Sequence, residues 1–122
     1  MYEVIIRQRF SAAHQLRDVS GIYENLHGHN WKVELVVSAK SLDPIGLVID
    51  FKIVDDVAKE IVDRFDHQVL NEIPLFQDLN PSAENIARII FEDLKEKLIS
   101  YSVQLKKVTV WETDTYGASY SC

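Results

Sequence analysis

Residues 27–40 (HGHNWKVELVVSAK) contain the pattern that decides the fold. Their odd positions carry His27, His29 and then apolar side chains, whereas most of the even positions are polar. Such alternation is typical of a β-strand in an antiparallel sheet with one buried face. Residues 1–14 alternate in the same way, so we expect two strands joined by a loop over residues 15–26.

Two amphipathic helices are predicted in the middle of the chain. After a short extended piece at residues 47–49, Asp50 is well placed to cap a helix whose apolar positions recur every three or four residues as far as Phe65. Residues 66–81 are irregular, and a second helix is expected to begin after Ser82.

Two further strands complete the predicted order, over residues 103–113 and residues 116–121. The order β-β-α-α-β-β predicts an α+β fold in which an antiparallel four-stranded sheet carries both helices on one face. The length of 122 residues fits a single domain over residues 1–122.

The composition excludes several classes of protein. A net charge of −6 without a Lys/Arg cluster argues against nucleic acid as the main partner. The single cysteine, Cys122, excludes an intrachain disulfide and a Cys-rich zinc module. No apolar run approaches the roughly 18 residues of a membrane span, and the N-terminus has no signal-peptide core. We therefore expect a cytoplasmic protein with no membrane partner.

Three of the four histidines surround one loop. His27 and His29 leave the same face of their strand, and His14 closes the strand before it. If the two strands form a hairpin, three imidazoles meet in the manner of a catalytic zinc site, which has three protein ligands and an open fourth position. Gly28 lies between the pair, where we expect the strand and the metal to come close. The alternative is that these histidines are ordinary polar residues at strand ends.

Three acidic residues are candidates for chemistry. Glu112 continues an apolar strand face, where a carboxylate either reaches solvent at a sheet edge or anchors an N–H fork such as the edge of a pterin or guanine. Glu24 is either a surface loop residue or a general base beside a zinc-bound substrate. Asp66 and His67 are sequence neighbours, which we do not expect to form a hydrogen-bonded pair. The alternative to a catalytic role is that His67 is a cation at a helix C-terminus.

The chain resembles the 6-pyruvoyl-tetrahydropterin synthase family over essentially its whole length. The resemblance rests on six motifs that follow one another in the family's order. These are residues 10–14 and 26–30 for the two zinc motifs, 46–51 before the first helix, 66–71 for the catalytic stretch, 80–85 at the start of the second helix, and 112–113 for the pterin-binding pair.

The resemblance implies a tunnelling fold (T-fold), whose subunits assemble into barrels. The usual assembly is a hexamer of two trimers, with the active sites at subunit interfaces. The implied substrate is 7,8-dihydroneopterin triphosphate, and the implied cofactor is one zinc ion per subunit. The implied site residues are His14, His27 and His29 as zinc ligands, Glu112 and Thr113 as pterin-binding residues, and Asp66 and His67 as catalytic residues.

One position departs from the family's usual pattern. Members that form the pyruvoyl or carboxy product carry a catalytic cysteine shortly before His27, where this chain has Tyr23. Glu24, three residues before His27, resembles instead the type III variant, which uses a glutamate in place of that cysteine. This resemblance implies a lyase that forms 6-hydroxymethyl-7,8-dihydropterin by aldolase-like cleavage in a folate-type pathway, with Glu24 as the base.

Three alternatives stay open at this point. The chain could be a 6-carboxy- or 6-pyruvoyl-tetrahydropterin synthase that works without cysteine. It could be a non-catalytic, zinc-stabilised oligomer that binds pterins. It could also hold a purely structural zinc closed by a fourth protein ligand, for which His67 is the candidate.

Overall fold

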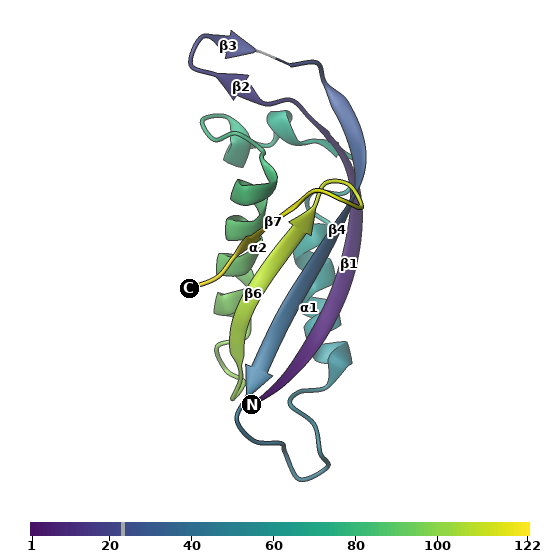
Figure 1. Cartoon of the computed structure of the whole chain (residues 1–122), viewed down its shortest axis with the longest axis vertical. Coiled ribbons are helices and arrows are strands. Elements are labelled where there is room, and N and C mark those ends of the chain that lie inside the picture. The colour runs from purple at the N-terminus through teal and green to yellow at the C-terminus, as the bar shows by residue number, and fades with distance from the viewer. Residues whose placement is uncertain (23) are drawn as a thin grey trace.

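A five-stranded sheet forms the centre of the protein, which is described by a computed structural model over residues 1–22 and 24–122 (Figure 1). The strand order across the sheet is β5-β1-β4-β6-β7. The strand bounds are Tyr2–His14 for β1, His27–Ala39 for β4, Gln68–Val69 for β5, Gln104–Trp111 for β6 and Gly117–Tyr120 for β7.

The first two long strands form one uninterrupted antiparallel ladder. Its register runs from Tyr2 opposite Ala39 to His14 opposite His27. The predicted pairing of these strands is therefore confirmed. The connection between them is more ordered than the expected loop, because β2 (Arg17–Asp18) and β3 (Gly21–Ile22) pair into a small hairpin that projects beyond the sheet (Figure 1).

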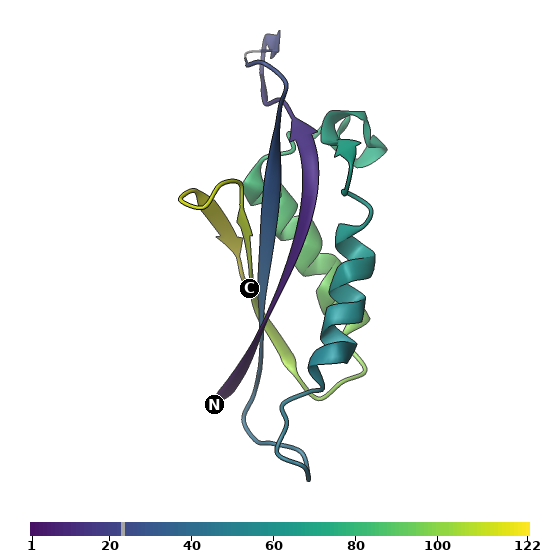
Figure 2. The ribbon, with the colours of Figure 1, turned by 90° about the vertical axis from the view of Figure 1, so that its right-hand side faces the viewer.

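Two helices cover one face of the sheet, as Figure 2 shows. Helix α1 (Phe51–Val62) begins where the Asp50 carboxylate accepts a hydrogen bond from the backbone N–H of Lys52. Helix α2 (Ala83–Lys97) begins where the hydroxyl of Ser82 accepts one from the backbone N–H of Asn85. Both predicted helices are confirmed, and with them the α+β class.

The core lies between this face and the helices. Alternate residues of β4, from Trp31 through Val33 and Leu35 to Val37, have no exposed surface and contact the apolar stripes of both helices. The other face of the sheet carries charged side chains such as Arg7 and Glu34, which form an ion pair. It is not covered by any described element, and we call it the open face.

Three details differ from the sequence expectations. Helix α1 ends at Val62, although Phe65 beyond it is still buried in the core. Residues 47–49 do not form a strand: Val48 and Ile49 are bends. Before them, the Asp43 carboxylate accepts hydrogen bonds from the backbone N–H groups of Ile45 and Leu47 and closes a turn.

The sheet is also not purely antiparallel or four-stranded. Strand β5 adds a fifth member that pairs in parallel with β1, where Ala12 faces Gln68 and Ala13 faces Val69. Two short 3₁₀ turns, Leu70–Glu72 and Pro74–Phe76, follow it. A two-residue strand has no periodicity to detect, which explains why residues 66–81 looked irregular. Neither helix in the described part of the chain is long and apolar enough to cross a membrane.

Candidate metal and substrate site

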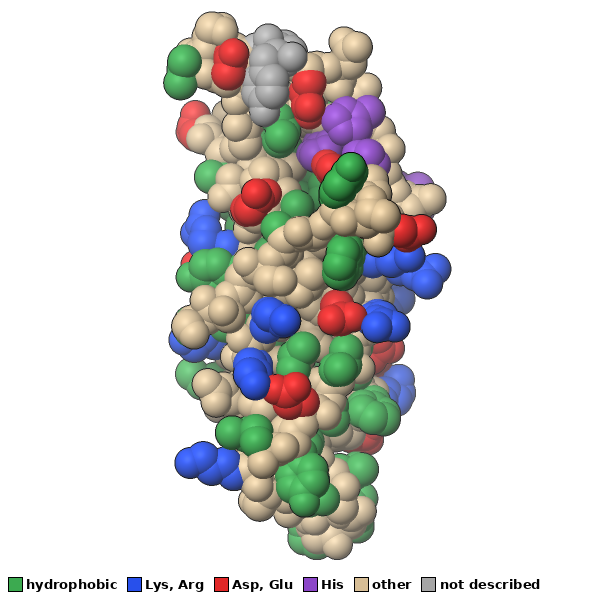
Figure 3. Space-filling model, viewed as in Figure 1, with side chains coloured by type: hydrophobic (Ala, Val, Ile, Leu, Met, Phe, Trp, Pro, Cys, Tyr) green, Lys and Arg blue, Asp and Glu red, His purple; other side chains and the backbone are tan. Residues whose placement is uncertain are grey.

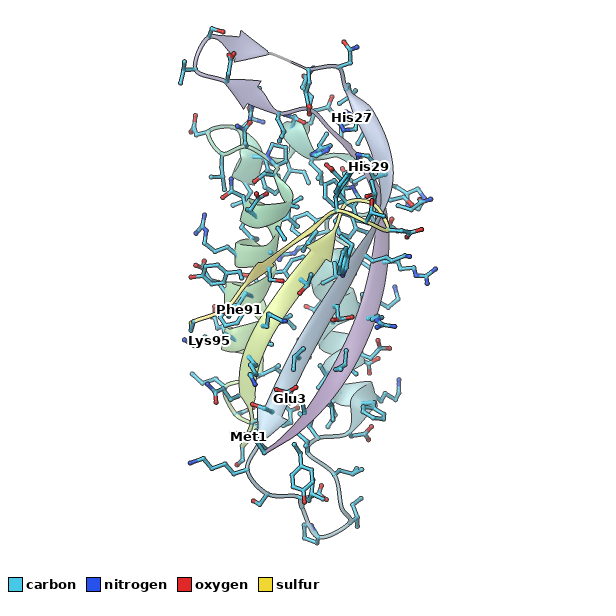
Figure 4. The ribbon with its side chains drawn as sticks, viewed as in Figure 1. Met1, Glu3, His27, His29, Phe91 and Lys95 are labelled. Carbon is cyan, nitrogen blue, oxygen red and sulfur yellow. The ribbon has the colours of Figure 1, made fainter. Side chains whose placement is uncertain are left out.

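The three predicted histidines meet at the end of the β1–β4 ladder. His27 and His29 start β4, at the end of the sheet from which the hairpin projects, and they are labelled in Figure 4. His14 ends β1 directly opposite His27. The centroids of the three rings lie 4.7 to 5.6 Å apart. Figure 3 shows the histidine side chains gathered at this end of the molecule, beside acidic side chains.

A carboxylate completes the cluster. Glu112, which follows β6, places its Oε1 atom 2.8 Å from Nε2 of His14 and 3.6 Å from Nε2 of His29. One donor atom from each of the four residues lies within 4.8 Å of the others. We call His14, His27, His29 and Glu112 the donor group.

The donor group fits a zinc ion chemically. The Nε2 atoms of His14 and His29 are buried without a hydrogen-bond partner, since the Glu112 contact lacks hydrogen-bond geometry. Buried polar atoms of this kind call for an explanation, and a metal ion provides one. Three imidazoles and a carboxylate are ligands that zinc binds in proteins.

Hydrogen bonds at Nδ1, the other ring nitrogen, support the fit to a zinc ion. Nδ1 of His14 lies 2.8 Å from the carbonyl oxygen of Pro81, and Nδ1 of His27 lies 2.8 Å from that of Asn25. A carbonyl accepts only from a protonated nitrogen, so Nε2 of each ring is left free to bind a metal. Burial is the main cause that lowers the pKa of His29, and its two histidine neighbours lower it further, against the opposing charge of Glu112. The neutral imidazole is the form that binds zinc.

The fourth donor differs from the residue that the sequence suggested. His67 was the candidate, but it is not a member of the donor group, and Glu112 is. The sequence did place Glu112 on the apolar face of its strand. It could not place Glu112 beside His14, because that contact depends on the packing of β6 against β4.

Asp66 and His67 form a separate pair. Oδ2 of Asp66 lies 3.0 Å from Nδ1 of His67, so the two side chains come within ion-pair distance. The reason is local: His67 has a φ of 59°, in the left-handed region, which brings consecutive side chains together outside a helix. The other Asp66 oxygen accepts a 2.8 Å hydrogen bond from the backbone N–H of Ser11, the main cause that lowers the pKa of Asp66.

This pair is not part of the donor group, although His67 and His29 line one pocket. His67 lines a shallow pocket of about 410 Å³ together with Ser11, Gly28 and Asn30 of the open face. Its side chain is 82% exposed. The structure therefore does not bring Asp66 and His67 into the donor group of the same chain. Gly28 lines the same pocket, and a Cβ atom built there would meet only the carbonyl oxygen of Ala12, at 3.9 Å.

Glu24 is tied to the segment that follows His14. Its Oε1 atom accepts a 2.8 Å hydrogen bond from the backbone N–H of Leu16, and its carbonyl accepts one of 3.0 Å from the side chain of Gln15. The second carboxylate oxygen has no hydrogen-bond partner among the residues that the structure describes. Tyr23, at the position of the missing cysteine, lies outside the described residues.

A tight turn fixes the position of Glu112. The backbone N–H of Glu112 donates to the carbonyl of Tyr116 over 2.9 Å, and the hydroxyl of Thr113 accepts from the backbone N–H of Tyr116 over 3.1 Å. Thr113 thus supports the turn that carries Glu112. The sequence analysis did not find the roles of Pro81 and Ser11, because both act through backbone groups that every residue possesses.

Together, the fold and the donor group define an α+β protein with a group of possible metal donors at the end of its first hairpin. Comparison with known proteins shows the family to which the chain belongs. Residues 3–122 match the family model described as 6-pyruvoyl tetrahydropterin synthase, and the chain belongs to this family. The family membership expected from the sequence motifs is confirmed.

Two curated relatives and one solved structure illustrate the range of the family. The chain is 38% identical over 118 residues to the dihydroneopterin monophosphate aldolase of Pyrococcus furiosus, covering 93% of this chain and 92% of the relative. It is 30% identical over 142 residues to the 6-carboxy-5,6,7,8-tetrahydropterin synthase of Haemophilus influenzae, covering 98% and 99%.

The solved structure is a Plasmodium vivax 6-pyruvoyltetrahydropterin synthase with a catalytic residue, a glutamate, replaced by alanine. It superposes with a TM-score of 0.79 at 22% identity, covering 98% of this chain and 96% of that one. At this identity the likeness concerns the fold, and it agrees with the T-fold expectation.

Proposed function

We propose that the chain is a zinc-dependent lyase that cleaves the side chain of a phosphorylated 7,8-dihydroneopterin and forms 6-hydroxymethyl-7,8-dihydropterin. The observation that carries the proposal is the position of Glu24. Its carboxylate is held by Leu16, two residues after the zinc-type ligand His14, in a chain whose one cysteine is at position 122. A carboxylate base suits proton removal from a hydroxyl group, and it cannot replace thiol chemistry step for step.

The relatives support this product and narrow the substrate. The relative from Pyrococcus furiosus is named for aldolase action on the monophosphate. The structural neighbour from Plasmodium vivax has a catalytic glutamate. The sequence motifs imply the triphosphate as substrate, so the number of phosphates is left for the assay to decide.

Zinc held by His14, His27 and His29 would supply a Lewis acid that stabilises negative charge on a substrate oxygen. Glu24 accepts the proton of the second side-chain hydroxyl at its free carboxylate oxygen. The O–H electron pair becomes the carbonyl of a departing two-carbon aldehyde phosphate. The bond between the first and second side-chain carbons breaks, and its electrons enter the pterin ring.

The remaining residues complete the reaction and hold the ring. A proton must return to the first side-chain carbon to leave the hydroxymethyl group, and we assign it to His67, oriented by Asp66. Glu112 would accept hydrogen bonds from the N–H edge of the pterin, with Thr113 supporting its turn. General acid and base steps of this kind contribute about 10²–10⁴-fold in rate each.

Assembly into a trimer or hexamer is part of the proposal. Strand β5 covers β1 only at Ala12 and Ala13, which leaves most of the β1 edge without a partner in the described chain. Such edges are normally covered. Active sites at subunit interfaces would let the Asp66–His67 pair of one subunit serve the donor group of a neighbour. The cytoplasmic location expected from the sequence is part of the same proposal.

The test is product analysis with purified, zinc-loaded protein. The monophosphate and the triphosphate of 7,8-dihydroneopterin are supplied separately, and the pterin formed is identified by mass spectrometry. We expect 6-hydroxymethyl-7,8-dihydropterin and a two-carbon aldehyde phosphate. A carboxy or pyruvoyl product would overturn the aldolase assignment and favour the activity named for the Haemophilus influenzae relative. Zinc and pterin binding without turnover would indicate a binding protein.

A pair of variants assigns the base. Glu24→Gln should abolish turnover while the zinc content stays at the wild-type level. Asp18→Asn is the matched control, because Asp18 lies in the same connection between β1 and β4 and also accepts a hydrogen bond from a backbone N–H, that of Ser20. This control removes the same charge and should keep its activity. Full activity in Glu24→Gln would exclude Glu24 as the base.

A further inference from the structure

Two asparagines hold the segment between His14 and the hairpin in the same way. Asn71 accepts from the backbone N–H of Gln15 over 2.9 Å and donates to the carbonyl of Gln15 over 2.8 Å. Asn80 accepts from the backbone N–H of Arg17 over 2.8 Å and donates to the carbonyl of Arg17 over 2.7 Å. Each side chain thereby makes the pair of hydrogen bonds that a residue of a neighbouring β-strand would make. The two asparagines form a matched pair.

Asn80 differs from Asn71 in being followed by a residue that contacts His14. The next residue, Pro81, is buried, and its carbonyl lies 2.8 Å from Nδ1 of His14. The carbonyl of Asn80 itself accepts a 2.9 Å hydrogen bond from the side chain of Asn85 in the first turn of α2. Asn80 is therefore fixed through both its side chain and its backbone, directly beside the atom that holds His14.

Arg17 fixes the approach to this carbonyl. Its guanidinium donates to the carbonyl of Phe76 over 2.6 Å, and to those of Gln77 and Leu79 over 3.2 Å each. The chain from residue 76 to residue 81 is thus bound at several carbonyls to one residue, and Asn80 joins the backbone of that residue to the same segment. Few degrees of freedom remain for the Pro81 carbonyl.

We propose that Asn80 is a positioning residue that, through the Pro81 carbonyl, keeps His14 in the tautomer with the proton on Nδ1 and Nε2 free for zinc. His14 is 1% exposed, so water cannot replace this acceptor if the carbonyl moves. A carbonyl that accepts from the second ring nitrogen fixes both the tautomer and the orientation of a ligating histidine. This inference rests on the zinc site of the proposed function.

The first experiment compares zinc affinity in matched variants. Zn²⁺ affinity is measured by competition with a chelating dye in wild type, Asn80→Ala and Asn71→Ala. Loss of outer hydrogen-bond partners typically weakens metal binding roughly 10–100-fold. We expect a loss in that range for Asn80→Ala and a loss well below tenfold for Asn71→Ala. Equal losses in the two variants, or none in Asn80→Ala, would overturn the proposal.

The second experiment observes the tautomer in metal-free protein by ¹⁵N NMR of the imidazoles. Wild type should show a slowly exchanging proton on Nδ1 of His14, and Asn80→Ala should lose this protection while Asn71→Ala keeps it. A wild-type His14 protonated on Nε2 overturns the proposal even if the Asn80 variant fails to fold. Wild type that binds no Zn²⁺ would instead contradict the proposed function, so the two failures are distinguishable.

Discussion

Glu112 is the acidic member of the donor group, and its carboxylate lies within 4 Å of two imidazoles whose Nε2 atoms have no hydrogen-bond partner. A negative charge at that distance attracts a divalent cation, whether or not the oxygen binds it directly. The same oxygen can also accept hydrogen bonds from a pterin edge. In the proposed function, Glu112 therefore serves both the metal and the pterin with one side chain.

Replacing Glu112 by Gln separates these two roles. The substitution keeps the shape and removes the charge, so we expect Zn²⁺ affinity to fall about tenfold, which corresponds to about 1.4 kcal/mol. The measurement is chelator competition, followed by KM for the pterin substrate at saturating zinc. Unchanged Zn²⁺ affinity with a raised KM would assign Glu112 to the pterin alone.

Asp66 makes stability depend on pH. Its pKa is lowered, first by the backbone N–H of Ser11 and then by His67, so the ionised form stabilises the folded state. That contribution is present above the ordinary carboxyl pKa of about 4 and is lost as pH falls through the lowered folded-state value. Asp66→Asn should be less stable than wild type at pH 7, and the difference should shrink in acid.

Urea unfolding at a series of pH values measures this effect. Asp114→Asn serves as a control, because Asp114 is 84% exposed and forms a surface ion pair with Lys32, and exposed pairs contribute little. A difference between wild type and Asp66→Asn that stays constant down to pH 2 would show that the carboxylate charge is not responsible.

The sequence predicts which side chains lie on the same face of a strand. It does not predict contacts that depend on strand packing or on an unusual backbone conformation. His27 and His29 share a face by strand alternation alone, and this required no structure. The approach of Glu112 to His14, by contrast, depends on how β6 lies against β4. The approach of Asp66 to His67 depends on one residue in the left-handed region, and although histidine adopts it more often than most residues, the sequence does not show where.

At the scale of elements, long periodic segments were predictable and short ones were not. The ladder of β1 with β4 and both helices follow from apolar periodicity and capping residues. The two-residue strand β5 and the hairpin of β2 and β3 have too few residues for a period. Their positions come from hydrogen bonds to β1 and from turn geometry.

Gly117, at the start of β7, limits how the turn that carries Glu112 can pack against Trp111. A Cβ atom there would lie 2.6 Å from Cε3 and 2.8 Å from Cδ2 of the Trp111 ring, which is too close for any side chain. Gly117→Ala should therefore displace the indole and destabilise the protein by about 1–3 kcal/mol. It should also lower Zn²⁺ affinity, because β7 begins at this residue and closes the Glu112 turn.

Gly28→Ala is the matched control for this prediction. A Cβ at that position would meet only the carbonyl oxygen of Ala12, at 3.9 Å, which is ordinary contact. We expect a change in unfolding free energy of about 0.5 kcal/mol or less, toward greater stability. Chemical denaturation of both variants gives the comparison, and equal destabilisation would mean that the Trp111 contact is not the cause.

At the scale of the whole molecule, zinc should stabilise the fold. The donor group joins both strands of the first hairpin to the end of β6, so bound metal links segments that separate on unfolding. A ligand that binds only the folded state adds about 2.7 kcal/mol at a concentration 100 times its Kd. For a chain of this size that corresponds to a rise in Tm of roughly 5–20 °C.

Thermal unfolding at fixed protein concentration, with and without Zn²⁺, tests this prediction. His29→Ala should remain folded without metal, since His29 is partly exposed, and should lose most of the zinc-dependent shift in Tm. A shift of the same size in His29→Ala would place the stabilising ion elsewhere.

The register of the first hairpin makes the distance between His14 and His27 independent of what connects them. Val19 and Ser20, at the tip of the connection, are exposed and lie outside every strand. Residues inserted there would lengthen the small hairpin beyond the sheet and leave the donor group in place. Evolution and protein engineering alike can thus diversify what enters the site by changing the length of this one connection.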